Sequence, residues 1–117
     1  MNRGEVFLSR LDPSEGSEQA GTRPVVIVSR DAINRSSPVI IVVPLTSWTE
    51  GRRIYPSQVL IQAPEGGLSA DSIALGEQVR AIARDRLVSR WGTLDPGSLR
   101  RIDRALLIAL DLPGQFG

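Results

Sequence analysis

Two polar side chains stand at the ends of two strongly apolar segments of the chain. Arg23 comes shortly before the segment Val25–Val28, and Thr46 comes shortly after Val39–Val43. If the two segments pair as neighbouring antiparallel strands, the start of the first lies beside the end of the second. Arg23 and Thr46 then converge, and a charged group with a planar fork of donors meets a hydroxyl group. The sequence therefore predicts a candidate site at this convergence.

Histidine and cysteine are both missing from the 117 residues. Their absence excludes disulfides and thiolate chemistry, and it removes the usual general base and the commonest transition-metal ligand. The sequence motifs of P-loops, nucleophile elbows and zinc sites are absent as well. We therefore expect any activity to proceed without histidine and without a metal ion or another cofactor.

All 14 basic residues are arginine, and 13 acidic residues leave a net charge of only +1. Arginine stays charged and its fork of donors suits phosphate, so this bias fits a nucleic-acid ligand. A genome with GC-rich codon usage would produce the same bias. Composition alone leaves both explanations open.

Length and composition fit one domain over residues 1–117. The chain is 41% hydrophobic and 23% charged, as in soluble globular proteins, and it is too short for two ordinary cores. No apolar run approaches the roughly 20 residues that span a bilayer, and no apolar block typical of a signal peptide follows the N-terminus. We expect a cytoplasmic protein that has no membrane partner.

Strand-like segments dominate the chain. The two apolar segments beside Arg23 and Thr46 should form the middle of the fold, with both of their faces buried. The other predicted strands are Glu5–Ser9, Arg52–Tyr55, Gln58–Ile61 and one longer strand over Ser72–Ile82 with a bulge at Gly76. Single helical turns are predicted at Arg30–Asn34 and Arg84–Val88.

The clearest helix begins after Asp95. Asp95 suits an N-cap, Pro96 suits the first helical position, and apolar residues then recur at spacings of three and four. This apolar stripe should pack on the sheet and leave Arg100, Arg101 and Arg104 on the outer face. Many short strands and one terminal helix predict a mainly β (α+β) fold, a small and strongly bent antiparallel sheet or barrel.

A long motif runs through the predicted site. It reads Leu-Asp-Pro-Ser-Glu-Gly-Ser-Glu-Gln-Ala-Gly-Thr-Arg-Pro over residues 11–24, with Val-Pro-Leu-Thr-Ser at 43–47 and Glu-Gln-Val at 77–79. Together with Arg-Gly-Glu-Val at 3–6, these segments resemble the MazF/PemK family of toxin ribonucleases from type II toxin–antitoxin systems. Similar proteins often have Asp-Gln-Val or Asp-Gln-Ile at the third segment, so Glu77 keeps the acidic group. Residues 51–70 match only loosely.

The resemblance implies an SH3-like antiparallel β-barrel with a C-terminal helix that works as a homodimer. It also implies an endoribonuclease, or mRNA interferase, that cuts single-stranded RNA without a metal ion. In such an enzyme the 2′-hydroxyl attacks the adjacent phosphate and leaves 2′,3′-cyclic phosphate and 5′-hydroxyl ends. A cognate antitoxin is implied as well, with an acidic tail that folds into the RNA groove and blocks it.

Three residues could supply this chemistry. Arg23 can bind the phosphate and stabilise the transition state, and a tightly engaged guanidinium could also donate the proton that the leaving group needs. Thr46 can bond a phosphate oxygen or orient the 2′-hydroxyl, but a free hydroxyl is too weak a base to act alone. Glu18 is the nearby carboxylate that could accept the proton. The identity of the base is the least determined part of this hypothesis.

Single-stranded RNA is held by phosphate contacts and by bases that stack on planar side chains. The side chains that could line its path are Ser17, Gln19, Ser47, Trp48, Arg52, Arg53, Gln78 and Arg80. Trp48 could equally be a partly buried packing residue, and Arg52 and Arg53 could be a solvated strand end. Trp91 is predicted to pack the terminal helix onto the barrel.

Two other functions remain open at this point. A toxin of similar fold that resembles the CcdB gyrase poisons would bind DNA gyrase and cut no RNA, and Gln115-Phe116-Gly117 faintly resembles the aromatic C-terminal end of those proteins. An inactive SH3-like binding module would bind its ligand without cleavage.

Overall fold

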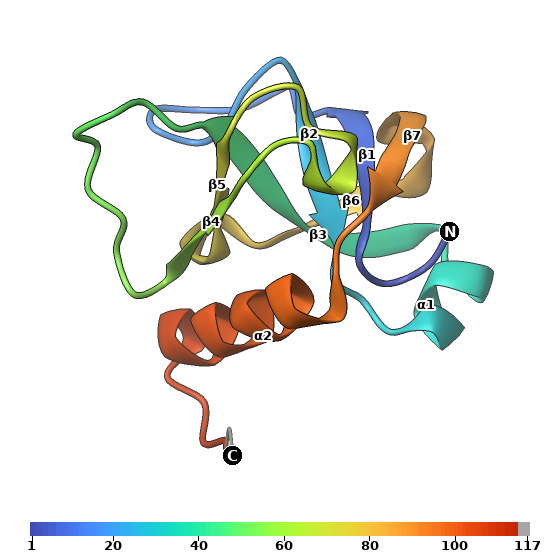
Figure 1. The fold of residues 1–117 in the computed structure, drawn as a ribbon. Helices are drawn as coiled ribbons and strands as arrows, with labels where there is room; N and C mark the ends of the chain where they lie inside the picture. The colour runs from blue at the N-terminus through green and yellow to red at the C-terminus, as the bar shows by residue number, and fades with distance from the viewer. Residues whose placement is uncertain (115–117) are drawn as a thin grey trace.

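Seven antiparallel strands and a C-terminal helix make up the computed structural model, which describes residues 1–114 (Figure 1). The strands are β1 (Glu5–Arg10), β2 (Thr22–Ile27), β3 (Val39–Ser47), β4 (Gln58–Ile61), β5 (Ser72–Leu75), β6 (Arg80–Ala83) and β7 (Leu87–Thr93). The helical elements are α1 (Asp31–Ser36), α2 (Pro96–Leu110) and three 3-10 turns, η1 (Glu65–Gly67), η2 (Gly76–Gln78) and η3 (Arg84–Arg86). The predicted fold class, mainly β with a terminal helix, is confirmed.

Strand β3 holds the sheet together. The strand order is β4-β5-β3-β2-β1-β7, and β6 pairs with β3 outside this path. The first part of β3 pairs with β6, its middle pairs with β2, and its last three residues pair with β5. One strand of nine residues thus contacts three neighbours, and the sheet bends around it (Figure 1).

The sheet buries apolar side chains on both faces. One cluster, which includes Val26 of β2, packs against Ile102 and Ala105 of α2. The other cluster lies on the opposite face and includes Val25 and Ile27. Because successive side chains of a strand point to opposite faces, β2 contributes to both clusters. Its predicted burial on both faces is confirmed.

The same prediction is wrong for the first part of β3. Val39 is 45% exposed and Ile41 is 38% exposed. Their cross-strand partners on β6 are Ala83 and Ala81, which are exposed too. Within residues 1–114, β6 covers the edge of β3 here but nothing covers this face. We call these four side chains the β3–β6 patch.

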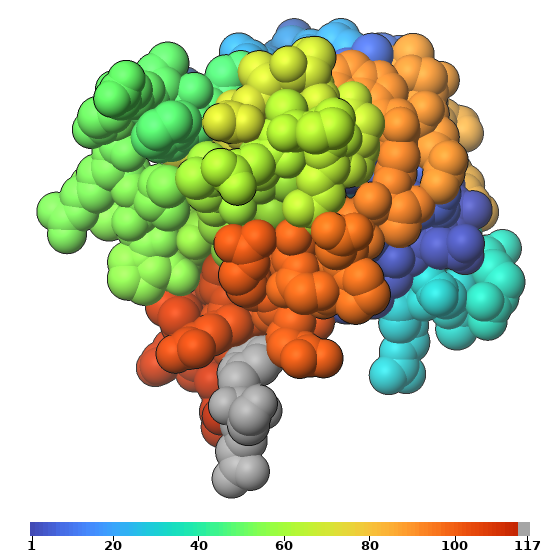
Figure 2. Space-filling view, viewed as in Figure 1, coloured from blue at the N-terminus to red at the C-terminus, as the bar shows by residue number. Residues whose placement is uncertain are grey.

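The strand predicted at Arg52–Tyr55 is wrong. In the described chain these residues are exposed and pair with no strand, although Gln58–Ile61 does form β4 at the edge of the sheet. Instead, the Arg53 guanidinium lies 4.8 Å above the Tyr55 ring. The segment between β3 and β4 forms the green protrusion at one side of the molecule (Figures 1 and 2). Alternation without a neighbouring strand edge is not enough to make a strand.

The long strand predicted over Ser72–Ile82 is also wrong, because η2 divides it into β5 and β6. A Cβ at Gly76 would lie 2.4 Å from the Ser57 carbonyl oxygen, and the Gly76 N–H donates to that same oxygen at 3.0 Å. The close backbone approach turns the chain where we predicted only a bulge. The helical turn predicted at Arg84–Val88 is the shorter η3, and strand β7, which begins at Leu87, was not predicted. This strand pairs only with β1 among the described strands, and the register of that pairing shifts twice.

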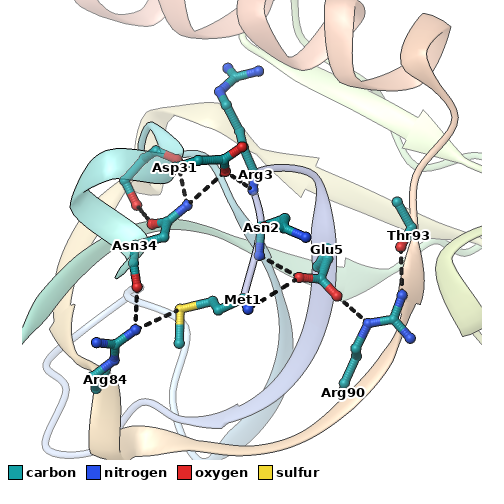
Figure 3. Close-up of polar contacts among 10 residues, drawn as sticks. Met1, Asn2, Arg3, Glu5, Asp31, Asn34, Arg84, Arg90 and Thr93 are labelled. Atoms are coloured by element: carbon teal, nitrogen blue, oxygen red, sulfur yellow. Dashed lines mark hydrogen bonds and ion pairs between the residues drawn. The ribbon is translucent and has the colours of Figure 1, made fainter. Parts of the chain in front are cut away.

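A polar network fixes the N-terminal segment (Figure 3). The buried carboxylate of Glu5 accepts hydrogen bonds from the Asn2 N–H and from the Arg90 guanidinium, which also donates to Thr93 Oγ1 at 2.8 Å. Burial alone would raise the pKa of Glu5. The hydrogen bonds from Arg90 and Asn2 outweigh burial and hold the pKa below its ordinary value.

Arg3 connects this segment to both helices. Its backbone N–H donates to Asp31 Oδ1 of α1 at 2.7 Å, and its guanidinium forms an ion pair with Asp103 of α2. The bond from the Arg3 N–H is the main reason why the pKa of Asp31 lies below its ordinary value. The N-terminus therefore joins α1, α2 and the sheet.

Helix α2 begins where the sequence predicts. Asp95 takes the N-cap position and Pro96 is the first helical residue, although the Asp95 side chain makes no capping bond. The three predicted outward arginines, Arg100, Arg101 and Arg104, are exposed. No helix within residues 1–114 is long and apolar enough to cross a membrane. Gln115-Phe116-Gly117, on which the gyrase-poison alternative rests, lies outside the described residues.

Candidate active site

Arg23 and Thr46 lie where strands β2 and β3 part. The last ladder pair between these strands is Val25 with Pro44, and Arg23 and Thr46 each lie two residues beyond it. Beyond this point β3 pairs with β5, so that Thr46 lies opposite Ile73. Pro24 and Pro44 lack backbone N–H donors, which explains why the ladder ends here. The two residues thus lie on either side of a fork between β2 and β3, and no hydrogen bond within residues 1–114 joins their side chains.

The two side chains differ in exposure and partners. Arg23 is exposed, and its Nε donates to the Ala20 carbonyl at 3.2 Å. Thr46 is half-buried within the β3–β5 ladder. Within residues 1–114 the two terminal nitrogens of Arg23 make no hydrogen bond or ion pair, so this exposed guanidinium can bind an anion.

A small pocket of 110 Å³ opens beside Arg23 in the fork. Strand β2 contributes Arg23 and Pro24 to its lining, and β3 contributes Leu45 and Ser47. The rest of the lining is Leu68, Ser69 and Ala70 before β5, Ser72 at the start of β5, and Trp91 of β7. Ser72 Oγ donates to the Ala70 carbonyl at 2.9 Å, whereas Ser47 and Ser69 are exposed. The pocket combines a guanidinium, free hydroxyl groups and an aromatic wall.

Only Arg23 and Ser47 of these lining residues were predicted to belong to a site, and the polar and aromatic residues that sequence reasoning missed are Ser69, Ser72 and Trp91. Trp91 does pack against the core cluster that contains α2 side chains, as predicted, but it also faces the pocket of Arg23. The available signal was the run of small residues before the strand at Ser72. Nothing in that run indicates that it folds back beside Arg23, because the contact depends on the η1 turn and on β7.

The loop between β1 and β2, residues 11–21, carries Glu18 and is held by its own hydrogen bonds. Leu11 N–H donates to the Gly21 carbonyl at 2.8 Å and closes the base of the loop. Near the tip, the Glu15 N–H donates to Glu18 Oε1 at 3.0 Å, and the Glu18 N–H donates to the Glu15 carbonyl at 3.1 Å. Glu18 is exposed, so its carboxylate has remaining acceptor positions.

Two residues predicted to bind RNA contact this loop. Gln78 Oε1 accepts the Gln19 N–H at 2.8 Å, and Gln78 Nε2 donates to the Ser17 carbonyl at 3.2 Å. Arg80 Nη1 donates to the Leu11 carbonyl at 3.2 Å. The structure therefore gives Gln78 and Arg80 a role in the loop's conformation.

A second hollow, of 210 Å³, lies between the loop and η2. It brings together Glu18, Gln19, Gln78 and Arg80 from the predicted set, along with Pro44, Glu77 and Val79. Pro44 shares one face of β3 with Thr46, because residues two apart on a strand point the same way. Glu77 is engaged elsewhere, since its carboxylate accepts bonds from Ser57 Oγ and Gln58 Nε2 at 3.2 and 2.6 Å.

The remaining predicted RNA-binding residues lie at the end of β3 and on the protruding segment between β3 and β4. Trp48 Nε1 donates to the Arg52 carbonyl at 3.2 Å, and Arg52 Nη1 donates to the Ser47 carbonyl at 3.4 Å. These bonds hold Trp48 and Arg52 together, with Trp48 half-buried. Arg53 stacks on Tyr55 further out. Ser47 is the member of this group that reaches the pocket of Arg23.

The arrangement has the components of phosphoryl chemistry. Arg23 supplies positive charge, Thr46 a hydroxyl group, and Glu18 a carboxylate from the neighbouring loop. Within residues 1–114, no three His, Cys, Asp or Glu side chains gather closely enough to hold a metal ion.

Comparisons with known proteins give a consistent result. The family described as PemK-like, MazF-like toxin of type II toxin-antitoxin system matches residues 2–110. The chain is 42% identical over 117 residues to the endoribonuclease MazF9 of Mycobacterium tuberculosis, covering 96% of this chain and 98% of that protein. It is 38% identical over 112 residues to the endoribonuclease EndoA of Bacillus subtilis, covering 96% of each. A solved endoribonuclease in complex with its cognate antitoxin, from a mycobacterial species, is similar with a TM-score of 0.80 and 27% identity, covering 98% of this chain and 99% of that one.

Proposed function

Because the chain belongs to the PemK-like, MazF-like family of toxins from type II toxin–antitoxin systems and is an endoribonuclease, we propose that it cuts single-stranded RNA at Arg23 and Thr46. The observation that carries this proposal is the fork between β2 and β3. At this fork the exposed guanidinium of Arg23 lies beside a pocket. Arg23 on β2 and Thr46 on β3 are each two residues from the last ladder pair. A phosphate bound by Arg23 would place the adjoining ribose and base against the surrounding walls.

We propose that three side chains divide the reaction among them. The 2′-oxygen attacks phosphorus, the bond to the 5′-oxygen breaks, and the products carry 2′,3′-cyclic phosphate and 5′-hydroxyl ends. Glu18 takes the proton of the 2′-hydroxyl, while Thr46 orients that hydroxyl or bonds a phosphate oxygen. Arg23 stabilises the charge of the pentacoordinate state. The guanidinium also gives a proton to the departing alkoxide, which is the stronger base. Arg23 then regains a proton from solvent and protonated Glu18 releases one to solvent, so that both side chains return to their starting states.

The pocket beside Arg23 is proposed to take the base next to the scissile phosphate. Its volume of 110 Å³ suits one small planar group, and its hydroxyl groups can bond the edge of a base. Trp91 supplies an aromatic wall against which a base can pack. This pocket would give the cut a base preference.

An antitoxin partner is proposed from the solved relative, which forms a complex with its cognate antitoxin. An acidic segment of such a partner suits Arg23 and the arginines near it, and it would exclude RNA by occupying the same groove. The enzyme and its inhibitor would then compete for one site. We propose that both act in the cytoplasm, where single-stranded RNA is available.

A second copy of the chain is proposed to cover the β3–β6 patch. Apolar side chains of two paired strands point outward there, with Val39 opposite Ala83 and Ile41 opposite Ala81. A patch of this kind can meet its own copy across a twofold axis, which is the commonest symmetry of soluble dimers. The homodimer would give RNA a longer groove than one chain offers.

The reaction is tested with purified protein and a long single-stranded RNA in the presence of EDTA. Cuts that carry 2′,3′-cyclic phosphate and 5′-hydroxyl ends are expected, since no step requires a metal ion. Intact RNA under these conditions, or cuts with 5′-phosphate ends, would contradict the proposed reaction.

A further inference from the structure

Gln78 contacts the loop of residues 11–21 on both sides of Glu18. Its Oε1 accepts the N–H of Gln19 at 2.8 Å, and its Nε2 donates to the carbonyl of Ser17 at 3.2 Å. A primary amide presents an acceptor and donors in one plane, so a single side chain can make both bonds. We propose that Gln78 is a positioning residue that holds Glu18 in place for the cleavage reaction.

The anchor of this clamp is rigid. Gln78 ends η2, whose first residue, Gly76, donates its N–H to the Ser57 carbonyl at 3.0 Å. The neighbouring Glu77 is held by Ser57 and Gln58. An amide fixed to such a turn can restrain the loop, because its own backbone has little freedom to follow the loop.

Arg80 restrains the other end of the same loop. Its guanidinium donates to the carbonyl of Leu11, the first residue of the loop, at 3.2 Å. The strand that follows η2 therefore holds the base of the loop while Gln78 holds its tip. The bond from Gln19 to Gln78 joins residues 59 positions apart and the bond from Arg80 to Leu11 joins residues 69 positions apart, so neither is one of the loop's own hydrogen bonds.

The clamp places Glu18 on the side of the sheet where the reaction is proposed. Glu18 and Pro44 line the same 210 Å³ hollow, and Pro44 shares its face of β3 with Thr46. One carboxylate oxygen of Glu18 accepts the Glu15 N–H, which leaves the other oxygen available for a proton. Without the Gln78 side chain, the Ser17 carbonyl and the Gln19 N–H on either side of Glu18 would lose these hydrogen bonds.

This inference rests on the proposed role of Glu18 as proton acceptor, and Gln78→Met tests it in the full-length chain. Methionine has a similar length and volume but makes neither hydrogen bond. The kcat for RNA cleavage is expected to fall on the order of ten- to a hundredfold with KM nearly unchanged, because a misplaced acceptor slows the chemical step and leaves RNA binding intact. Amide hydrogen exchange at Gln19 is expected to accelerate, because that N–H loses its acceptor.

Two companion variants complete the test. Gln62→Met makes the same chemical change at an exposed position that follows β4 and has no recorded side-chain hydrogen bond in residues 1–114, so it should leave both readouts unchanged. In a Glu18→Gln background, Gln78→Met should cause little further loss of kcat, because the group that it positions is already disabled.

The outcomes separate the clamp from the proposed reaction. Unchanged exchange at Gln19 in Gln78→Met overturns the clamp. A raised KM with kcat preserved, or a loss that adds fully to that of Glu18→Gln, assigns Gln78 to direct RNA contact and overturns the positioning role. If Glu18→Gln cleaves RNA like the wild type, the proposed acceptor and the catalytic purpose of the clamp both fail, whereas faster exchange at Gln19 still establishes the clamp itself.

Discussion

Arg23 and Thr46 each lie two residues beyond the last ladder pair of β2 and β3, at the point where β3 leaves β2 for β5. Each residue is paired with one neighbouring strand, because Arg23 lies opposite Ser9 of β1 and Thr46 lies opposite Ile73 of β5. Two of the proposed catalytic residues therefore lie on paired strands, whereas the third, Glu18, lies on a loop. A loop residue needs contacts from outside the loop to hold its position, and the proposed clamp by Gln78 would supply them.

Arg23→Ala should reduce the rate of RNA cleavage by about two to four powers of ten, about 3 to 5 kcal/mol, because a preorganised donor to the transition state is lost. The fold should survive, since the side chain is exposed. Single-turnover cleavage is the measurement, with circular dichroism as the check on folding. Arg23→Lys keeps the positive charge but loses the planar fork of donors, so its cleavage rate should lie between those of the wild type and Arg23→Ala. Wild-type cleavage by Arg23→Ala would remove this residue from the mechanism.

Thr46→Val keeps the shape of the side chain and removes its hydroxyl group. Cleavage should fall on the order of ten- to a hundredfold, the value of one hydrogen bond to a charged group. Thr46→Ser should restore most of the activity, because it returns the hydroxyl group. Equal activity in the valine and serine variants would show that the hydroxyl group takes no part.

Trp91→Leu and Ser69→Ala should change which base is preferred at the cut, because both alter the pocket beside Arg23. Sequencing the ends of cut RNA from a random pool measures this preference. Ser89→Ala, at an exposed position of β7 outside the pocket, serves as the control. A base preference that is the same in all three variants would place base recognition elsewhere.

Ile41→Asp should convert the homodimer into a monomer, because it puts an unpaired charge at the centre of the β3–β6 patch. Sedimentation velocity measures the change directly. Val88→Asp places the same charge at another exposed apolar residue, on β7, and should leave the dimer intact. A dimeric Ile41→Asp protein would show that the interface lies on another surface.

Glu5→Gln should lower the free energy of unfolding at pH 7 by about 1 to 3 kcal/mol, because the bonds to Arg90 and the Asn2 N–H then lack a charged acceptor. The pKa of Glu5 is lowered in the folded state, so its stabilisation is complete above its ordinary value of about 4.5 and is lost as the pH falls through the lower folded value. The difference between wild type and variant should therefore shrink below about pH 4.5. Urea unfolding across pH 3 to 7 tests this.

Glu50→Gln is the matched control for that experiment. Glu50 is exposed and takes part in no ion pair recorded in residues 1–114. Its variant should follow the wild-type curve at every pH. If the difference in free energy of unfolding between the wild type and Glu5→Gln stays constant with pH, the charge of Glu5 does not stabilise the fold.

The sequence by itself determined the fold class and the central strands, and it identified Arg23 and Thr46 as candidate site residues. Apolar β-branched runs specify strands through burial, and capping residues together with a spacing of three and four specify α2. The long motif over residues 11–24 then connected these elements with the MazF/PemK family. Each of these signals is local, or depends on a pattern that one strand or helix carries within itself.

Tertiary structure alone decided how the site is completed. The pocket beside Arg23 depends on Trp91 of β7, a strand that local pattern did not reveal, and the clamp on Glu18 depends on η2, which replaced a predicted bulge. The pocket and the clamp both depend on close approaches between backbone segments, such as that of Gly76 to Ser57. The pattern of apolar residues along the sequence does not predict such approaches. The residues Val39 and Ile41 were likewise predicted to be buried, because hydrophobicity alone does not distinguish a core residue from an exposed apolar patch.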